Sequence, residues 1–206
     1  MFLLKNGGDF GVVARDRDSM PYLYQSGSHH PGMYTLETSR SGTGPMAALA
    51  TMLMLGREGF RTLLGHVVEM AEVLREGLEA HPDLTVLNGD NVGPVTLFRV
   101  YPPGVDTFTI KERERTEAAS QAQVEVFNQL NRRVFERVNA EALTGRGVVI
   151  SMTDCYRTTD FGTPIAALKS YVLSPFTDEE RMHSIIEHVL KARDEVLRED
   201  QSGIIS

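Results

Sequence analysis

The sequence predicts an α+β fold in which a small antiparallel or mixed sheet carries helices on one face. Three observations support this prediction: helical periodicity dominates from residue 45, strand-like runs come in two pairs, and the order after residue 57 is α-β-β-α-β-β-α. The chain has 206 residues, of which 41% are hydrophobic and 24% charged, which is typical of a globular protein. We find no internal repeat and no low-complexity linker.

Residues 1–35 are rich in Gly, Asp, Tyr, Ser and His. Residues 2–4 and 10–14 are expected to form short strands, with a turn at 7–9, and residues 24–34 a loop. This segment has the character of the end of a sheet whose other strands lie elsewhere.

Two helical patterns follow. Pro45 suits a first helical position, and the run from Met46 to Leu55 is apolar on nearly all faces, which predicts a helix buried all round. From Arg57 the pattern becomes amphipathic and continues to His81-Pro82, where proline stops it.

The remainder alternates between strand and helix patterns. Strands are expected at 84–88 and 94–101, a charged stretch lies at 111–115, and an amphipathic helix is expected over 117–143. Two more strands are expected at 147–152 and 166–174. The last helix should begin at Thr177, with Glu180 completing a capping box.

Composition narrows the function classes. The formal net charge of −7 and the pI of about 5.4 argue against a nucleic-acid-binding surface. A single cysteine, Cys155, rules out an internal disulfide and a cysteine-built zinc cage, so a cytoplasmic location is expected. The first residues lack the apolar core of a signal peptide, and the longest apolar run is half the roughly 20 residues that a membrane span needs. Neither a nucleic-acid nor a membrane partner is expected.

The most suggestive local feature is SRSGTGP at 39–45. Small residues before a helix expose several amides and the positive end of the helix dipole, which together favour an anion, and Arg40 adds a fixed charge. The stretch lacks the GK[ST] ending of a nucleotide P-loop. An ordinary capped helix start with a surface arginine explains the same residues, and local evidence alone favours it.

Three other candidates have simpler explanations. Adjacent His29 and His30 point in different directions and have no further ligand at metal spacing, so a solvated loop is favoured over a metal site. Lys169 lies in an apolar strand on the face of Tyr171, as an edge gatekeeper or as a cation for a carboxylate. Cys155 has no accompanying His and Asn in the pattern of a catalytic cysteine, so we interpret it as an inert thiol.

Taken together, the pieces resemble a known family. The sequence SRSG precedes a small-residue apolar helix, then come Gly56-x-x-Gly59-Phe60, a long helix, P-x-L-x-V and VTLFRV, and the chain closes with ALKSYVLSPFTDEERMHSIIEHV. This order resembles the group II pyridoxal-phosphate-dependent decarboxylases, which include the glutamate, aromatic amino acid, histidine and 2,4-diaminobutyrate decarboxylases. The resemblance covers most of residues 35–200.

The resemblance implies a fold and a domain plan. The family has the fold-type-I, aspartate-aminotransferase-like fold, and this chain would supply its C-terminal part. Residues 1–44 would be the tail of the large cofactor domain with an active-site loop, 45–81 long buried or interdomain helices, and 82–206 the small C-terminal α+β domain. Family members are homodimers with active sites at the subunit interface.

The resemblance also assigns site residues. The segment that would lie near the phosphate of the neighbouring subunit's cofactor comprises Ser39, Arg40, Ser41 and Gly42. Lys169 stands where the family has an arginine that grips the substrate carboxylate; lysine keeps the charge but loses the bidentate fork. The loop 24–34 falls where the family has a mobile catalytic loop, which makes Tyr34 the catalytic candidate and His29 and His30 substrate-contact candidates.

One expected feature has no counterpart in this sequence. The family binds pyridoxal phosphate as a Schiff base to a lysine in a His-Lys pair, whereas none of Lys5, Lys111, Lys169 and Lys191 follows a histidine. We therefore expect roughly the last two fifths of an amino-acid decarboxylase, without the large domain and inactive alone. Open alternatives are another fold-type-I enzyme (an aminotransferase or carbon–sulfur lyase), a non-catalytic α+β module for dimerisation or ligand binding, and coincidental similarity.

Overall fold

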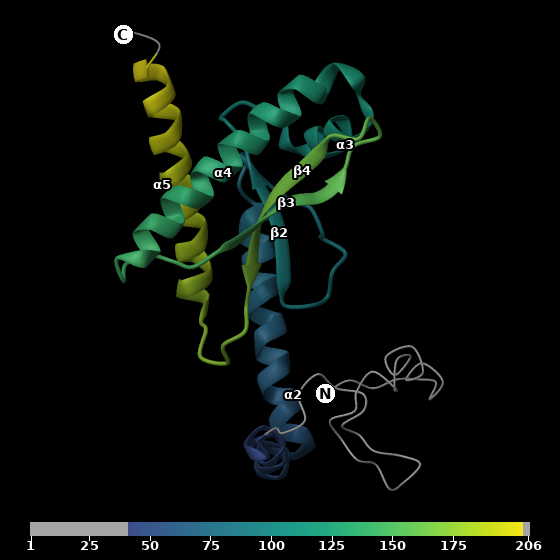
Figure 1. Cartoon of the computed structure of the whole chain (residues 1–206), viewed down its shortest axis with the longest axis vertical. Coiled ribbons are helices and arrows are strands. Elements are labelled where there is room, and N and C mark those ends of the chain that lie inside the picture. Colours follow the sequence, from purple (N-terminus) through teal and green to yellow (C-terminus); the bar gives the residue numbers. More distant parts are fainter. Residues whose placement is uncertain (1–40, 204–206) are drawn as a thin grey trace, which may run out of the picture. The chain divides into compact units, whose positions relative to one another are not determined.

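A computed structural model describes residues 41–203 (Figure 1). The chain falls into two units that meet between Gly56 and Arg57, and each is described by itself. The strands expected at 2–4 and 10–14 and the loop expected at 24–34 lie outside the described residues.

Helix α2 (Thr43–Glu79) is interrupted at Gly56, whose φ of 57° and ψ of −170° are not helical. Glycine reaches this conformation without the steric penalty that a Cβ brings. The interruption falls where the sequence changes from an all-round apolar to an amphipathic pattern. In the first arm, Met46, Leu53 and Met54 each expose about two thirds or more of their surface (65%, 77% and 78%), so the burial predicted for this arm stays a prediction.

The second arm of α2 packs as its amphipathic pattern predicts. Its inward stripe consists of apolar residues spaced one helical turn apart, and Ala71, Leu74 and Leu78 are fully buried. The helix ends at Glu79, just before the His81-Pro82 pair that the sequence marks as a stop.

Four antiparallel strands form one sheet in the order β1-β2-β4-β3. Strands β1 (Leu84–Val86) and β2 (Val95–Val100) form one hairpin, and β3 (Ser151–Thr158) and β4 (Pro164–Tyr171) form another. Strand β4 is central, because Phe98 of β2 pairs with Leu168 on one side and Met152 of β3 pairs with it on the other.

The helices complete the fold. They are α3 (Thr107–Thr116), the short 3₁₀ helix η4 (Ala118–Ser120), α4 (Gln121–Leu143) and α5 (Glu179–Gly203). Buried apolar residues from the second arm of α2, from α4 and from α5 share one core with Phe98 and Leu168 of the sheet. Figure 1 shows α4 and α5 beside the strands. A small sheet with helices on one face is therefore confirmed.

Three local predictions differ from the structure. The charged stretch at 111–115 belongs to helix α3, which Asp106 caps by accepting the N–H of Phe108. Strand β3 begins at Ser151, later than the apolar run at 147–152 suggests. The predicted capping box at Thr177 is wrong, because Asp178 caps α5 by accepting the N–H of Arg181 at 2.9 Å.

Helix α4 supplies two asparagines that join diverging strands. Beyond the β2–β4 pairing, the Asn131 amide accepts from the N–H of Val100 at 3.0 Å and donates to its carbonyl at 2.9 Å. Asn128 accepts from the N–H of Ala166 at 2.9 Å and donates to the carbonyl of Pro164 at 2.8 Å. Each side chain thus replaces a missing strand partner for buried backbone groups.

Candidate functional site

Lys169 is the sequence-predicted site residue that the structure places most fully. It lies on central strand β4, opposite Leu97 of β2 and Ser151 of β3. Because side chains alternate along a strand, Lys169 points to the opposite face from its buried neighbour Leu168. The lysine is half-buried, on the sheet face opposite the helix-packed core.

An aromatic ring orients the Lys169 ammonium group. Its Nζ lies 5.1 Å from the centre of the Tyr171 ring, within the range of a cation–π contact. Tyr171 is two residues further along β4, so the two side chains share a face, as the sequence predicts. The ring holds the ammonium without cancelling its charge.

No salt bridge joins Lys169 to a carboxylate among residues 41–203. The other two lysines in this range are engaged, since Lys111 donates to the carbonyl of Val86 and Lys191 pairs with Glu141. Lys169 can therefore accept an external anion without first breaking an internal ion pair.

The neighbouring strand β3 adds hydroxyl groups and a bulge. The Ser151 hydroxyl donates to the carbonyl of Lys169 at 3.4 Å, and the Tyr156 hydroxyl donates to the carbonyl of Leu87 at 3.1 Å. The pairing with β4 is irregular between Thr153 and Arg157. Cys155 lies in this irregular stretch as an exposed free thiol.

Ser41 caps the start of α2. The Ser41 hydroxyl lies 2.7 Å from that of Thr43 and accepts the N–H of Thr43 at 3.2 Å. Among residues 41–203, nothing lies within 4 Å of the positions that a Cβ would take at Gly42 or Gly44, and the first turn has no acidic residue. No described side chain therefore covers the backbone at Gly42 and Gly44.

The structure does not bring all predicted site residues together. Ser41 and Gly42 belong to the first unit, whereas Lys169 belongs to the second. His29, His30, Tyr34, Ser39 and Arg40 lie outside the described residues. Their assigned roles remain predictions.

Sequence reasoning missed a buried polar network beside β2. The Arg99 guanidinium donates to Glu114 at 3.1 Å and to Asn128 at 2.8 Å, and the Tyr101 hydroxyl donates to Glu114 at 3.1 Å. Arg99 and Glu114 are almost fully buried. Burial raises the pKa of the Glu114 carboxyl and the pKa of the Tyr101 hydroxyl above their usual values. The sequence feature that could have indicated this network is Arg99, a charged residue inside the apolar run VTLFRV.

Two kinds of feature are absent from residues 41–203. In residues 41–203 no helix has the length and apolar character of a membrane span. No cluster of three or more His, Cys, Asp or Glu side chains within that range could hold a metal ion.

Comparisons with known proteins now give the fold a context. No family model matches the sequence, and no curated protein matches it. Solved structures do match. Mouse CSAD in apo form has a TM-score of 0.60 at 11% identity, covering 88% of this chain and 34% of that chain. Oryza sativa TDC with PLP and tryptamine has a TM-score of 0.58 at 19% identity, covering 82% and 30%.

A third match is Catharanthus roseus tryptophan decarboxylase in complex with L-tryptophan, with a TM-score of 0.53 at 16% identity, covering 79% of this chain and 28% of that one. The chain thus spans about a third of the length of the solved chains that it matches. At such low identity the likeness concerns the fold. It confirms that the chain has the fold of part of a pyridoxal-phosphate decarboxylase, as the sequence resemblance implies.

Proposed function

We propose that this chain is the C-terminal portion of a pyridoxal-phosphate-dependent amino-acid decarboxylase. The observation that carries the proposal is the fold: most of the chain superposes on about a third of each matched enzyme chain. The cation of Lys169 lies on the strand where the family resemblance expects a carboxylate anchor. Fold alone does not fix a reaction, so the assignment depends on this combination.

In the proposed enzyme, Lys169 binds the substrate carboxylate. An ammonium group is a point charge with rotatable donors, whereas a guanidinium holds a carboxylate in a planar fork. Tyr171 compensates in part, because its ring restricts where the ammonium can lie. Orienting the carboxylate is the contribution of this chain, while bound pyridoxal phosphate supplies the electron sink for decarboxylation.

The start of α2 fits the phosphate end of that cofactor. Gly42 and Gly44 leave the backbone approachable, and no acidic side chain in the first turn opposes an anion. In the proposed homodimer, Ser39, Arg40, Ser41 and Gly42 contact the phosphate held by the neighbouring subunit. The loop with His29, His30 and Tyr34 would cover the substrate, with Tyr34 as a proton donor.

The covalent lysine of the cofactor is proposed to come from outside these 206 residues. No lysine of the sequence follows a histidine, and Lys111 and Lys191 are engaged elsewhere. The chain alone should therefore not decarboxylate amino acids.

The test is to add pyridoxal phosphate to the chain, reduce with borohydride and map labelled lysines by mass spectrometry. We expect no stoichiometric adduct at a single lysine. A stoichiometric adduct on Lys169 would contradict two proposals: that Lys169 binds the substrate carboxylate, and that the covalent lysine of the cofactor lies outside these residues.

Lys169 itself is tested in the enzyme that contains this chain. We expect Lys169→Met to raise KM for the amino acid and to lower kcat/KM by roughly tenfold or more, because a charge-assisted bond to the carboxylate is lost. Lys191→Met, which removes a surface lysine on α5, is the matched control. Unchanged kinetics in Lys169→Met would remove Lys169 from the site.

A further inference from the structure

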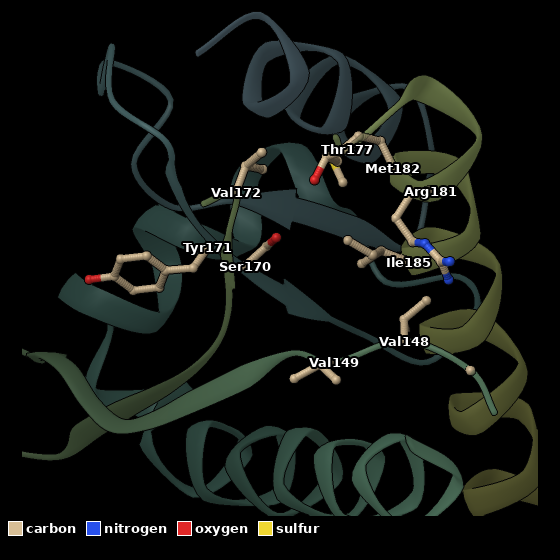
Figure 2. Close-up of a pocket in the computed structure, with 10 residues that line it drawn as sticks. Val148, Val149, Ser170, Tyr171, Val172, Thr177, Arg181, Met182 and Ile185 are labelled. Carbon is tan, nitrogen blue, oxygen red and sulfur yellow. The ribbon is translucent and has the colours of Figure 1, made fainter. Parts of the chain in front are cut away.

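A cavity of about 270 Å³ lies between β4 and the first turns of α5, closed on one side by the segment before β3. Figure 2 shows the side chains that line it. Its walls are mostly apolar, from Val148, Val172, Met182 and Ile185. All four are buried residues of the core.

The cavity is distinct from the Lys169 site. Ser170 of β4 lines it, and Ser170 is adjacent to Lys169, so the two side chains point to opposite faces of the sheet. Figure 2 shows the Tyr171 ring directed away from the Ser170 hydroxyl. A ligand in this cavity would therefore not occupy the site proposed for the amino-acid carboxylate.

The hydroxyl group of Ser170, a cavity-lining residue, has no partner within residues 41–203. Ser170 is 2% exposed and its hydroxyl forms no hydrogen bond with another residue of the described range. A hydroxyl without a partner keeps a free hydrogen-bond donor, so a ligand that supplies an acceptor would be favoured at this spot.

Arg181, an exposed residue, brings a cation to the rim of the same cavity. Figure 2 shows its guanidinium beside Ile185, which lies one turn further along α5. Arg181 forms no salt bridge within residues 41–203. The nearby Asp178 carboxylate accepts the backbone N–H of Arg181 as the cap of α5, so it does not occupy the guanidinium.

We propose that this cavity binds a small monocarboxylate with an apolar body. The guanidinium of Arg181 pairs with the carboxylate, the Ser170 hydroxyl donates a second hydrogen bond, and the apolar walls enclose the rest. The volume is just below that of common ligand pockets, which limits the ligand to a short aliphatic chain or a single ring. The inference is independent of the proposed decarboxylase function.

The experiment is an amide NMR titration of the full chain with hydrocinnamate, and with hydrocinnamyl alcohol as its uncharged counterpart. Binding predicts saturable shifts at Gly147, Val172 and Ile185 with the acid, and affinity at least roughly tenfold weaker for the alcohol. Shifts that do not saturate, or equal affinity for acid and alcohol, would overturn the proposal.

Variants then separate the polar contacts from the cavity. Arg181→Gln should weaken hydrocinnamate binding by roughly tenfold, and Ser170→Ala by a smaller factor, because each removes one contact to the carboxylate. Arg198→Gln makes the same change at an exposed position further along α5 and should leave the affinity unchanged. Equal affinities for Arg181→Gln and Arg198→Gln would refute the role of Arg181.

Discussion

The asparagine that joins β2 to α4 offers the sharpest test of the fold. Replacing Asn131 by leucine keeps the number and branching of the side-chain heavy atoms but removes both hydrogen bonds to Val100, a residue with no exposed surface. Each buried backbone group left unpaired costs about 1–3 kcal/mol, so two cost ~2–6 kcal/mol. Burial of the leucine side chain returns ~1.5–3 kcal/mol, which leaves a net loss of ~2 kcal/mol at the midpoints of the two ranges.

A loss of that size is a large fraction of the ~5–15 kcal/mol that stabilises a typical domain. Urea unfolding followed by far-UV circular dichroism measures it, and an unchanged slope with denaturant would show that the native state is still compact. Asn139→Leu on the exposed side of α4 is the matched control and should change the free energy of unfolding by less than about 0.5 kcal/mol. If the two variants unfold within about 0.5 kcal/mol of each other, the reasoning fails.

Three further outcomes concern charges. Because burial raises the pKa of Glu114 in the folded state, its contribution to stability is present below the unfolded value of 4.5 and is lost as the pH rises through the folded pKa. Wild type should therefore lose stability relative to Glu114→Gln as the pH rises above about 4.5, measured by thermal melts; a parallel pair of curves would contradict this. Arg137→Ala removes an exposed pairing with Glu199 and should cost roughly 0.5 kcal/mol in low salt and almost nothing in high salt, by urea unfolding. Hydrogen bonds from Thr109 and from the backbone of α3 lower the pKa of Asp106, so Asp106→Ala should lower the melting temperature near neutral pH and lose its effect as the pH falls through that pKa.

Periodicity was enough to place most elements. The apolar stripe of α4, which includes Val124, Val134 and Val138, is buried as its spacing predicts. The stop at His81-Pro82 and the change of pattern at Gly56 both coincide with structural boundaries. These features are local, because each depends on residues within one or two helical turns.

The misplaced strand and the missed network have a common physical cause. Strand β3 carries exposed or half-exposed side chains on both faces, so its sequence has no apolar alternation. The strand was therefore predicted at the apolar run just before it. Asn128 and Asn131 look like surface residues of α4 until the strands that diverge beside them are known. Their backbone partners come from β2 and β4, about 30 residues or more away, and no local pattern encodes them.

The contrast between two sheet cations supports the proposal that Lys169 binds an anion. Arg99 of β2 is buried and pairs with Glu114, which a buried guanidinium requires because an isolated charge in the interior is very unfavourable. Lys169 of the adjacent strand contacts an aromatic ring instead of a carboxylate. A ring attracts the ammonium but leaves its net charge intact, so the cation is oriented and still available. Its strand is held in register by neighbours on both sides, which fixes the anchor of the side chain at the centre of the sheet.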